Sequence, residues 1–239
     1  MNEEKNVGQA VTEPAPNYKP TMDDELNRYW GISYPQFVER LVKTAGAREG
    51  EKVLDMATGA AMMPGKLFAD YLPQEWIVSV DVSQAMLSEG RRALSENLDS
   101  KNIDRVCASA MEMPFDDGAF NVIICGLGAH HMNVPKMLAE AKRLLAKDGR
   151  LVIGDMGATP FWRRTVGKIV LGLLMVERGF IRRSSRSRAE AEAYKNVRTA
   201  REWLDILLDF GFTKIHIEDF RPRRPWFPSR LTLQAVMAE

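Results

Sequence analysis

The sequence is poor in cysteine, has no clear excess of charge and contains no set of residues spaced to bind zinc. Only 2 cysteines occur among 239 residues, Cys107 and Cys125, and both lie in apolar, strand-like runs where a small thiol is typically buried. The 33 basic residues nearly balance the 32 acidic ones, and the net charge of +1 gives no general attraction to nucleic acid. These absences argue against a metal centre and are consistent with a reducing, cytoplasmic setting.

Long hydrophobic runs and targeting signals are also missing. The longest apolar runs, such as IVLGLLMV at residues 169–176, are far shorter than the ~20 residues that a helix needs to cross a bilayer. Residues 1–20 lack the basic start and apolar core of a secretion signal and read as a disordered tail. We therefore expect a cytoplasmic protein that touches a membrane at most peripherally.

The sequence does contain a regular alternation of apolar, strand-like runs and amphipathic helical segments. A helical region at 22–47, with Gly31 and Pro35 as possible breaks, precedes this alternation. Strands are expected at 52–56, 76–80, 104–108, 120–125 and 150–155, with helices at 62–72, 84–97 and 134–146 between them. Because these strands are apolar nearly throughout, they should be parallel strands that are covered on both faces. The predicted fold is a doubly wound α/β structure.

The alternation is interrupted once, by residues 157–198. A helix at 199–210 and strands at 213–219 and 230–237 then resume it. These last strands would complete a mostly parallel, seven-stranded sheet with an α-helical cap at its N-terminal side. We therefore expect one domain at 21–239 after the tail, with 157–198 as a helical lid inserted into it.

The run VLDMATGAAMMPG at residues 53–65 predicts a ligand site. It reads as a buried strand, a turn of small residues and a helix start, which together bring backbone N–H groups close to a ligand. A second strand ends at Asp81, about 25 residues later, where a carboxylate can accept hydrogen bonds from both hydroxyls of a ribose. The alternative is that Asp81 only caps the next helix together with Ser83.

Four segments carry a resemblance to a known family: VLDMATGAA, VSVDVSQAML, MPFDDGAFNVIICGLGAHHM and LAEAKRLLAKDGRLVIGD. Through them the chain, over about residues 22–239, resembles the class I methyltransferases that use S-adenosylmethionine, in the branch that contains the quinone-biosynthesis methyltransferases. The resemblance implies a Rossmann-like fold, S-adenosylmethionine as the cofactor and a transferase activity of the methyltransferase type.

The resemblance also implies where the cofactor binds. The family's motif acid and central glycine match Asp55 and Gly59, while Ala57 replaces the first glycine and Ala61 replaces the third. The first replacement is common in the quinone branch. The second is a departure from the pattern, and its methyl group is expected to narrow the methionine end of the site.

Two further strand ends complete the implied cofactor site. Asp81, with Val82 beside it, matches the ribose-binding acid. Ser109 stands where the family often has an acid for the adenine amino group, and a neutral hydroxyl accepts a weaker hydrogen bond than a carboxylate. The remaining residues of the implied site are Ala110 and Met111, along the adenine ring, and Gly126, near the transferred methyl group.

Methyl transfer is an in-line displacement at an activated methyl group, so the enzyme mainly aligns and desolvates the acceptor. A base is needed only if the acceptor must lose a proton. His130 and His131 follow the fourth strand, and His130 is the candidate base, with a structural role as the alternative for either histidine. Asp116 and Asp117 precede a glycine and are typical of a solvated turn rather than a catalytic pair.

The insertion at 157–198 changes from apolar to strongly basic. Its first half has apolar residues at helical spacing, and residues 160–188 carry 8 basic residues against Glu177 alone. Three explanations stay open: a lid that covers a flat hydrophobic acceptor and pairs its anionic groups with arginine, contact with anionic lipid, or a packed helix followed by a solvated basic loop. For the lid, the candidate acceptor-binding residues are Trp162, Arg178, Arg182 and Trp226.

The first hypothesis is therefore methyl transfer from S-adenosylmethionine to a small, partly hydrophobic, anionic acceptor by a monomer or a homodimer. A second keeps the fold but uses the site for another one-carbon transfer, a non-methylating reaction or binding alone, because Ala61 and Ser109 weaken two expected cofactor contacts. A third is a lipid-binding module. Nucleic acid is not expected as the acceptor, because CGLGAH stands where base-methylating members of the class have a proline-containing motif.

Overall fold

The computed structural model describes residues 18–71, 76–95, 102–181, 193–222 and 224–237. Seven strands form one sheet within these ranges. They are β1 (Val53–Met56), β2 (Ile77–Asp81), β3 (Ile103–Cys107), β4 (Phe120–Gly126), β5 (Leu145–Gly157), β6 (Phe212–Phe220) and β7 (Ser229–Met237). Their order in the sheet is β3-β2-β1-β4-β5-β7-β6.

The chain winds outward from the middle of the sheet in both directions. The first five strands are parallel, and β7 runs antiparallel to both β5 and β6. β2 and β3 lie on one side of β1, and β4 and β5 lie on the other, so the strand order reverses between β1 and β4. Doubly wound sheets bind ligands at the carboxyl ends of the strands beside such a reversal. The predicted mostly parallel, seven-stranded fold is confirmed.

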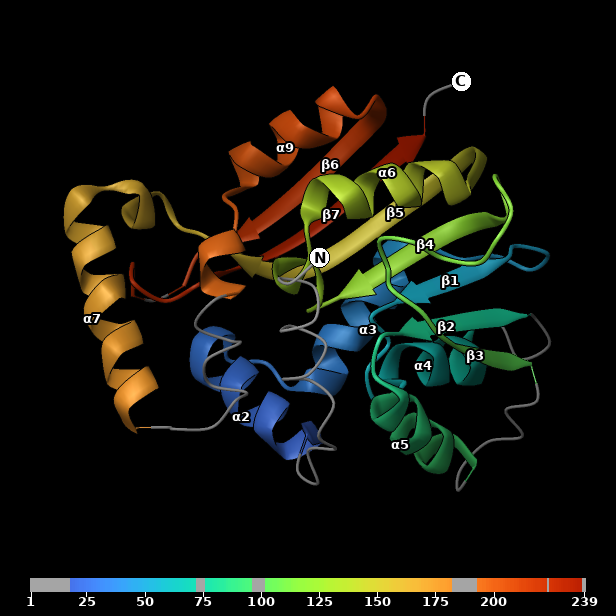
Figure 1. Cartoon of the computed structure of the whole chain (residues 1–239), viewed down its shortest axis with the longest axis horizontal. Coiled ribbons are helices and arrows are strands. Elements are labelled where there is room, and N and C mark those ends of the chain that lie inside the picture. Colours follow the sequence, from blue (N-terminus) through green and yellow to red (C-terminus); the bar gives the residue numbers. More distant parts are fainter. Residues whose placement is uncertain (1–17, 72–75, 96–101, 182–192, 223, 238–239) are drawn as a thin grey trace.

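Helices cover both faces of the sheet (Figure 1). The helices are α2 (Tyr18–Trp30), α3 (Tyr34–Ala45), α4 (Met62–Asp70), α5 (Gln84–Ser95), α6 (Val134–Leu144), α7 (Thr165–Ile181) and α9 (Ala200–Asp209). Short 3-10 turns are η1 (Ala129–His131), η2 (Pro160–Arg163) and η3 (Tyr194–Asn196). The apolar residues of α3 and α4 pack on one face, and those of α6 and α9 pack on the other.

Helix α3 packs closely on the middle of the sheet because two neighbouring strands carry glycine there. Gly126 of β4 pairs with Gly154 of β5 in the register of the sheet. A Cβ atom on Gly154 would lie 2.8 Å from the Phe37 ring, and one on Gly126 would lie 2.6 Å from the Met63 methyl group. The two glycines therefore let α3 and α4 approach the strand ends that border the expected site.

The N-terminal helical region consists of two helices rather than one. Gly31 has a φ of 68° between α2 and α3, and Ser33 caps α3 in a reciprocal pair of hydrogen bonds with Gln36. α2 begins at Tyr18 and thus includes residues 18–20, which were expected to belong to the tail. The other residues of that predicted tail, 1–17, lie outside the described part of the chain.

Strand β5 begins earlier than the sequence pattern predicted. Leu145 was expected to continue a helix, but it pairs with Phe120 at the start of β4. Asp148 then takes a φ of 59°, and the regular register resumes at Arg150. Pairing with the neighbouring strand overrides the helical periodicity here.

The insertion leaves the sheet after β5 and returns to it at α9. It contains η2, α7 and η3, and residues 182–192 lie outside the described ranges. The Ala158 N–H donates to the Arg198 carbonyl oxygen at 2.8 Å, which joins the two ends of the insertion. Among the helices of the described ranges, none combines the length and the apolar character that crossing a bilayer requires.

Candidate functional site

The loop between β1 and α4, residues 57–61, is called the β1 loop and turns sharply, as the motif predicts. Ala57, Gly59 and Ala61 have φ values of 57°, 54° and 59°, so every second residue lies in the left-handed region. Glycine adopts this region freely, whereas an L-residue is strained there by roughly 1–2 kcal/mol. The β1 loop therefore places two alanines in a conformation that favours glycine.

Each of the two alanine methyl groups faces a glycine on a neighbouring segment. A Cβ atom on Gly128, after β4, would lie 2.7 Å from the Ala57 Cβ. One on Gly90, in α5, would lie 2.8 Å from the Ala61 Cβ. Ala61 is only 3% exposed, and its methyl group points toward α5. The narrowing of the site that was expected from Ala61 has no support in this orientation.

Exchanging the alanine and the glycine tests this pairing. Gly128→Ala alone is expected to lower the free energy of unfolding by roughly 1–3 kcal/mol, because the new methyl group overlaps that of Ala57. Adding Ala57→Gly removes the overlap and should restore most of the loss, measured by urea unfolding. Gly172→Ala is the control, since nothing lies within 4 Å of its added Cβ and no stability should be lost. A double variant no more stable than Gly128→Ala would show that the two positions do not compensate each other.

Two buried carboxyl groups hold the β1 loop, one from each of the first two strands. Asp55 of β1 is 1% exposed, and its Oδ2 accepts the Thr58 hydroxyl at 2.6 Å. Burial raises the pKa of Asp55 to about 7; the Thr58 hydrogen bond opposes this rise and the negative charge of Asp81 adds to it. Asp55 therefore acts inside the β1 loop, where it stabilises the turn.

Asp81 joins the β1 loop to the end of β2. Its Oδ2 accepts the Gly59 N–H at 2.9 Å, and its Oδ1 accepts the Ser83 N–H at 2.8 Å. Burial raises the pKa of Asp81, and these two hydrogen bonds oppose the rise. Ser83 in turn caps α5 through the Met86 N–H, so Asp81 does support that helix start, as the alternative interpretation requires. A carboxylate has about four acceptor positions, which leaves Asp81 capacity for two further donors.

The remaining residues of the expected cofactor site are Val82, next to Asp81, and Ser109, Ala110 and Met111 in the turn after β3. Val82 is 51% exposed, Ala110 is buried and Met111 is half-buried. The Ser109 hydroxyl oxygen accepts the Met111 N–H at 3.2 Å, so it already supports the turn. Unlike a carboxylate, this hydroxyl then offers a ligand only one further acceptor position.

A buried histidine and a buried aspartate meet where β4 and β5 end. His130 is 4% exposed and Asp155 is 1% exposed. His130 Nδ1 lies 2.6 Å from Asp155 Oδ1, and the His130 backbone N–H donates to Asp155 Oδ2 at 2.8 Å. A carboxylate beside Nδ1 favours the tautomer that carries its proton there, which makes Nε2 the basic nitrogen. This geometry fits an imidazole that exchanges a proton at Nε2.

The histidine–aspartate pair belongs to the same edge of the sheet as the β1 loop. Gly128, two residues before His130, is the residue that packs against the Ala57 methyl group. Burial raises the pKa of the Cys125 thiol well above its usual range, and the negative charges of Asp155 and Asp55 add to this rise. The charges of Asp155 and Asp55 both act on the Cys125 thiol at the end of β4, which is consistent with all three groups lying at this edge of the sheet.

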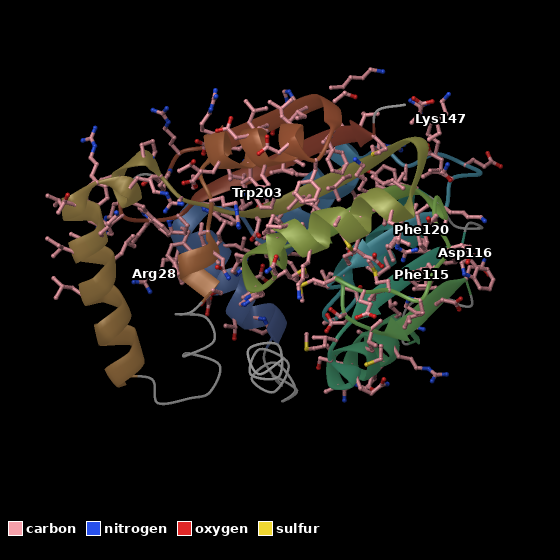
Figure 2. The ribbon with its side chains drawn as sticks, turned by 45° about the horizontal axis from the view of Figure 1, so that its top comes forward. Arg28, Phe115, Asp116, Phe120, Lys147 and Trp203 are labelled. Carbon is pink, nitrogen blue, oxygen red and sulfur yellow. The ribbon has the colours of Figure 1, made fainter. Side chains whose placement is uncertain are left out.

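The other titratable residues considered as catalytic candidates are His131, which lies beside His130, and Asp116 and Asp117, which lie apart from the histidine–aspartate pair. His131 is half-buried, and its ring centroid is 4.1 Å from that of His130. Asp116 and Asp117 are both exposed, and Asp117 Oδ1 accepts the Arg143 Nη1–H at 2.8 Å. Figure 2 shows Asp116 at the far end of the sheet, near the start of β4. This placement supports the prediction that the two aspartates form a solvated turn.

Trp162, expected at the acceptor, lies in the interior of the insertion. It is 2% exposed and packs with Ala158 and Val197 in a small apolar cluster. Its ring centroid is 5.8 Å from that of Tyr194. Ala158 and Val197 come from the two ends of the insertion, which the hydrogen bond between Ala158 and Arg198 joins. The structure thus gives Trp162 a packing role, and its contact with the acceptor stays a prediction.

The other three residues expected at the acceptor are only partly described. Trp226 is 37% exposed and precedes a segment attached to α2, where Trp30 Nε1 donates to the Pro228 carbonyl oxygen at 3.0 Å. The Arg178 side chain and all of Arg182 lie outside the described part of the chain.

Sequence reasoning missed two residues at the edge of the site. Asp155 stands near the end of a predicted strand, so the strand-end rule that selected Asp81 would also have found it. Arg198 is half-buried where the insertion returns; burial lowers the pKa of its guanidinium, while the charges of Glu202 and Asp155 raise it. No sequence signal marks Arg198, because its position depends on the path of the insertion.

The chain has relatives of known name and fold. A sequence model described as the ubiE/COQ5 methyltransferase family matches residues 22–160. The chain is 30% identical over 129 residues to the ubiquinone/menaquinone biosynthesis C-methyltransferase UbiE of Paracoccus denitrificans, an alignment that covers 52% of this chain and 51% of that protein. It is 26% identical over 169 residues to the demethylmenaquinone methyltransferase of Symbiobacterium thermophilum, with 62% and 67% covered. The chain thus spans only about half the length of the first relative.

The fold also resembles that of geranyl diphosphate C-methyltransferase from Streptomyces coelicolor, whose crystal structure is a complex with Mg2+, geranyl diphosphate and S-adenosyl-L-homocysteine. The TM-score is 0.67 at 16% sequence identity, over 96% of this chain and 88% of that one. At this identity the likeness concerns the fold alone.

Proposed function

The chain belongs to the ubiE/COQ5 methyltransferase family, and from this premise we propose that it transfers the methyl group of S-adenosylmethionine to a small, partly hydrophobic acceptor. The family predicted from the sequence motifs is thereby confirmed. One observation carries the proposal: Asp81, at the end of β2, accepts the Gly59 N–H of the β1 loop at 2.9 Å. A carboxylate and a closely turning peptide chain thus lie together at the switch point of the sheet, as a nucleoside site requires.

The residues at this edge fit S-adenosylmethionine. Asp81 has acceptor positions for two ribose hydroxyls, and the exposed Val82 offers an apolar surface to adenine. Gly59, without a side chain, lets a ligand approach the backbone. When bound, the cofactor supplies a methyl group that its sulfonium already activates, so the protein has to align the acceptor and exclude water.

His130 is proposed to take the proton that the acceptor loses. Asp155 orients the imidazole through Nδ1 and also holds the backbone N–H groups of His130 and Met156. The proton is accepted at Nε2, and the Asp155 carboxylate stabilises the imidazolium that forms. His130 is therefore the catalytic residue, and Asp155 is a positioning residue.

For the acceptor we propose a hydrophobic aromatic ring of the quinone type that carries an acidic hydroxyl group. The names of the two relatives support a quinone-type acceptor. A ring hydroxyl supplies the proton that His130 is placed to accept. The half-buried Arg198, whose backbone carbonyl oxygen accepts the Ala158 N–H just after β5, offers a cation to the anion that remains.

Titration calorimetry with S-adenosylmethionine and with its demethylated product tests the cofactor. We expect both to bind with dissociation constants of roughly 1 μM to 1 mM, the range usual for enzyme substrates. If neither binds at millimolar concentration, the proposal fails and a methyltransferase fold put to another use becomes the better interpretation. That alternative now rests on Ser109, because the Ala61 methyl group points toward α5.

A further inference from the structure

Helix α7 exposes three large apolar side chains, here called the α7 stripe: Val166, Ile169 and Leu173, which are 63%, 60% and 66% exposed. Residues spaced by three and four positions lie on the same face of a helix, so the three side chains form one continuous stripe. Single exposed apolar residues are normal on a protein surface, whereas an aligned group marks a face that something else covers.

The α7 stripe faces away from the part of the protein to which the helix is attached. Figure 1 shows α7 at the edge of the molecule, outside the helical layers that cover the sheet. On its attached side, a Cβ atom on Gly167 would collide with the Phe161 carbonyl group, and Leu171 packs against the cluster around Trp162. Positions 167 and 171 lie more than a quarter turn from the stripe at 3.6 residues per turn. The attached face and the α7 stripe are therefore different sides of one helix.

Positive charge accompanies the α7 stripe. Arg164 and Lys168 are exposed at the beginning of α7, whereas the Arg163 guanidinium is bound to Glu202 at 2.6 and 2.8 Å. Residues 160–181 contain four basic residues and one acidic residue. An apolar face with basic neighbours is typical of a helix that lies in the surface of an anionic bilayer.

We propose that the α7 stripe docks this protein on an anionic lipid surface. Val166, Ile169 and Leu173 would enter the boundary between headgroups and acyl chains. Arg164 and Lys168 lie outside the stripe near the start of α7, and their long, exposed side chains would reach the lipid phosphates from beside it. The charge favours lipid over a second copy of the chain, because two copies joined through this stripe would bring their basic residues together. Docking places the insertion where a hydrophobic acceptor partitions, but it does not depend on the proposed reaction.

Co-sedimentation with vesicles tests the proposal, using the full chain without cofactor. Vesicles of phosphatidylcholine with phosphatidylglycerol should bind the protein, and vesicles without the anionic lipid should bind it more weakly; added salt should weaken binding to the anionic vesicles. Replacing Ile169 and Leu173 together by serine should lower the partition coefficient at least about tenfold, because their apolar area no longer leaves water. Lys168→Glu should lower it about fivefold or more through the lost attraction.

Leu208→Ser is the matched control, because Leu208 is 55% exposed on α9 and its replacement removes the same kind of surface elsewhere. It should leave vesicle binding unchanged. No sedimentation with anionic vesicles at low salt, or an equal loss in the Leu208→Ser control, would overturn the proposal. A dimer that the paired serine substitutions dissociate, without vesicle binding, would assign the α7 stripe to a second copy and would also overturn it. Binding of S-adenosylmethionine is measured in a separate calorimetric experiment. A failure of lipid docking can therefore be distinguished from a failure of the proposed methyl transfer.

Discussion

Replacing Asp81 by alanine is expected to weaken the binding of S-adenosylmethionine by about a hundredfold to a thousandfold, the loss that follows from two hydrogen bonds to a charged acceptor. The carboxylate lies at the end of β2 and is already fixed through the Gly59 and Ser83 N–H groups. It therefore meets a ribose without having to be ordered first. Asp81→Asn keeps one acceptor oxygen but no charge, so its affinity should fall between those of the alanine variant and the unchanged protein. Titration calorimetry measures both.

A matched variant separates cofactor binding from support of helix α5. Ser83→Ala removes the cap that the Met86 N–H receives and should lower the free energy of unfolding by about 1 kcal/mol, with affinity for S-adenosylmethionine nearly unchanged. If Asp81→Ala merely reproduced the result of Ser83→Ala, with a loss of stability and normal affinity, Asp81 would be a helix cap and the ribose contact would be refuted.

Replacing His130 by glutamine is expected to lower kcat about a hundredfold to ten thousandfold, the usual contribution of a positioned general base. The measurement is methyl transfer from S-adenosylmethionine to demethylmenaquinone in its reduced form, the acceptor type proposed above. The rise of kcat with pH that reflects formation of neutral imidazole should disappear in this variant. Asp155→Asn should lower kcat less, because the imidazole remains but loses the carboxylate at 2.6 Å from Nδ1. Affinity for S-adenosylmethionine should be unchanged in both, since neither side chain is proposed to hold it.

The neighbouring histidine provides the control for this experiment. His131 lies in ring contact with His130, at 4.1 Å between centroids, and is less deeply buried. His131→Gln should leave kcat and its pH profile nearly unchanged. A purely structural pair would behave differently: His130→Gln and Asp155→Asn would lower the unfolding temperature while kcat per folded molecule and its pH dependence stayed the same. That result would remove His130 from the mechanism.

The two carboxyl groups show how far local sequence signals reach. Asp81 was found because it stands at the end of an apolar run, where a parallel sheet brings side chains to its binding edge, and Asp55 was found because it matches the motif acid of the family that the sequence resembles. Asp155 obeys the same strand-end rule as Asp81 and was overlooked. The environment of Trp162 could not be predicted, because an aromatic residue in an insertion gives no sign of whether it points outward or packs inside.

The sequence by itself determined the strands, the order of elements and the sharp β1 loop, because apolar periodicity and small turn residues are properties of short segments. Only the tertiary structure decided which distant residues meet. Asp81 bonds to a residue 22 positions away, and His130 meets Asp155 across 25 positions. The Ala57 and Ala61 methyl groups fit because Gly128 and Gly90 lie opposite them. Such contacts are fixed by the strand register and by how closely the helices approach the sheet. A sequence pattern within a short segment contains no information on either of these.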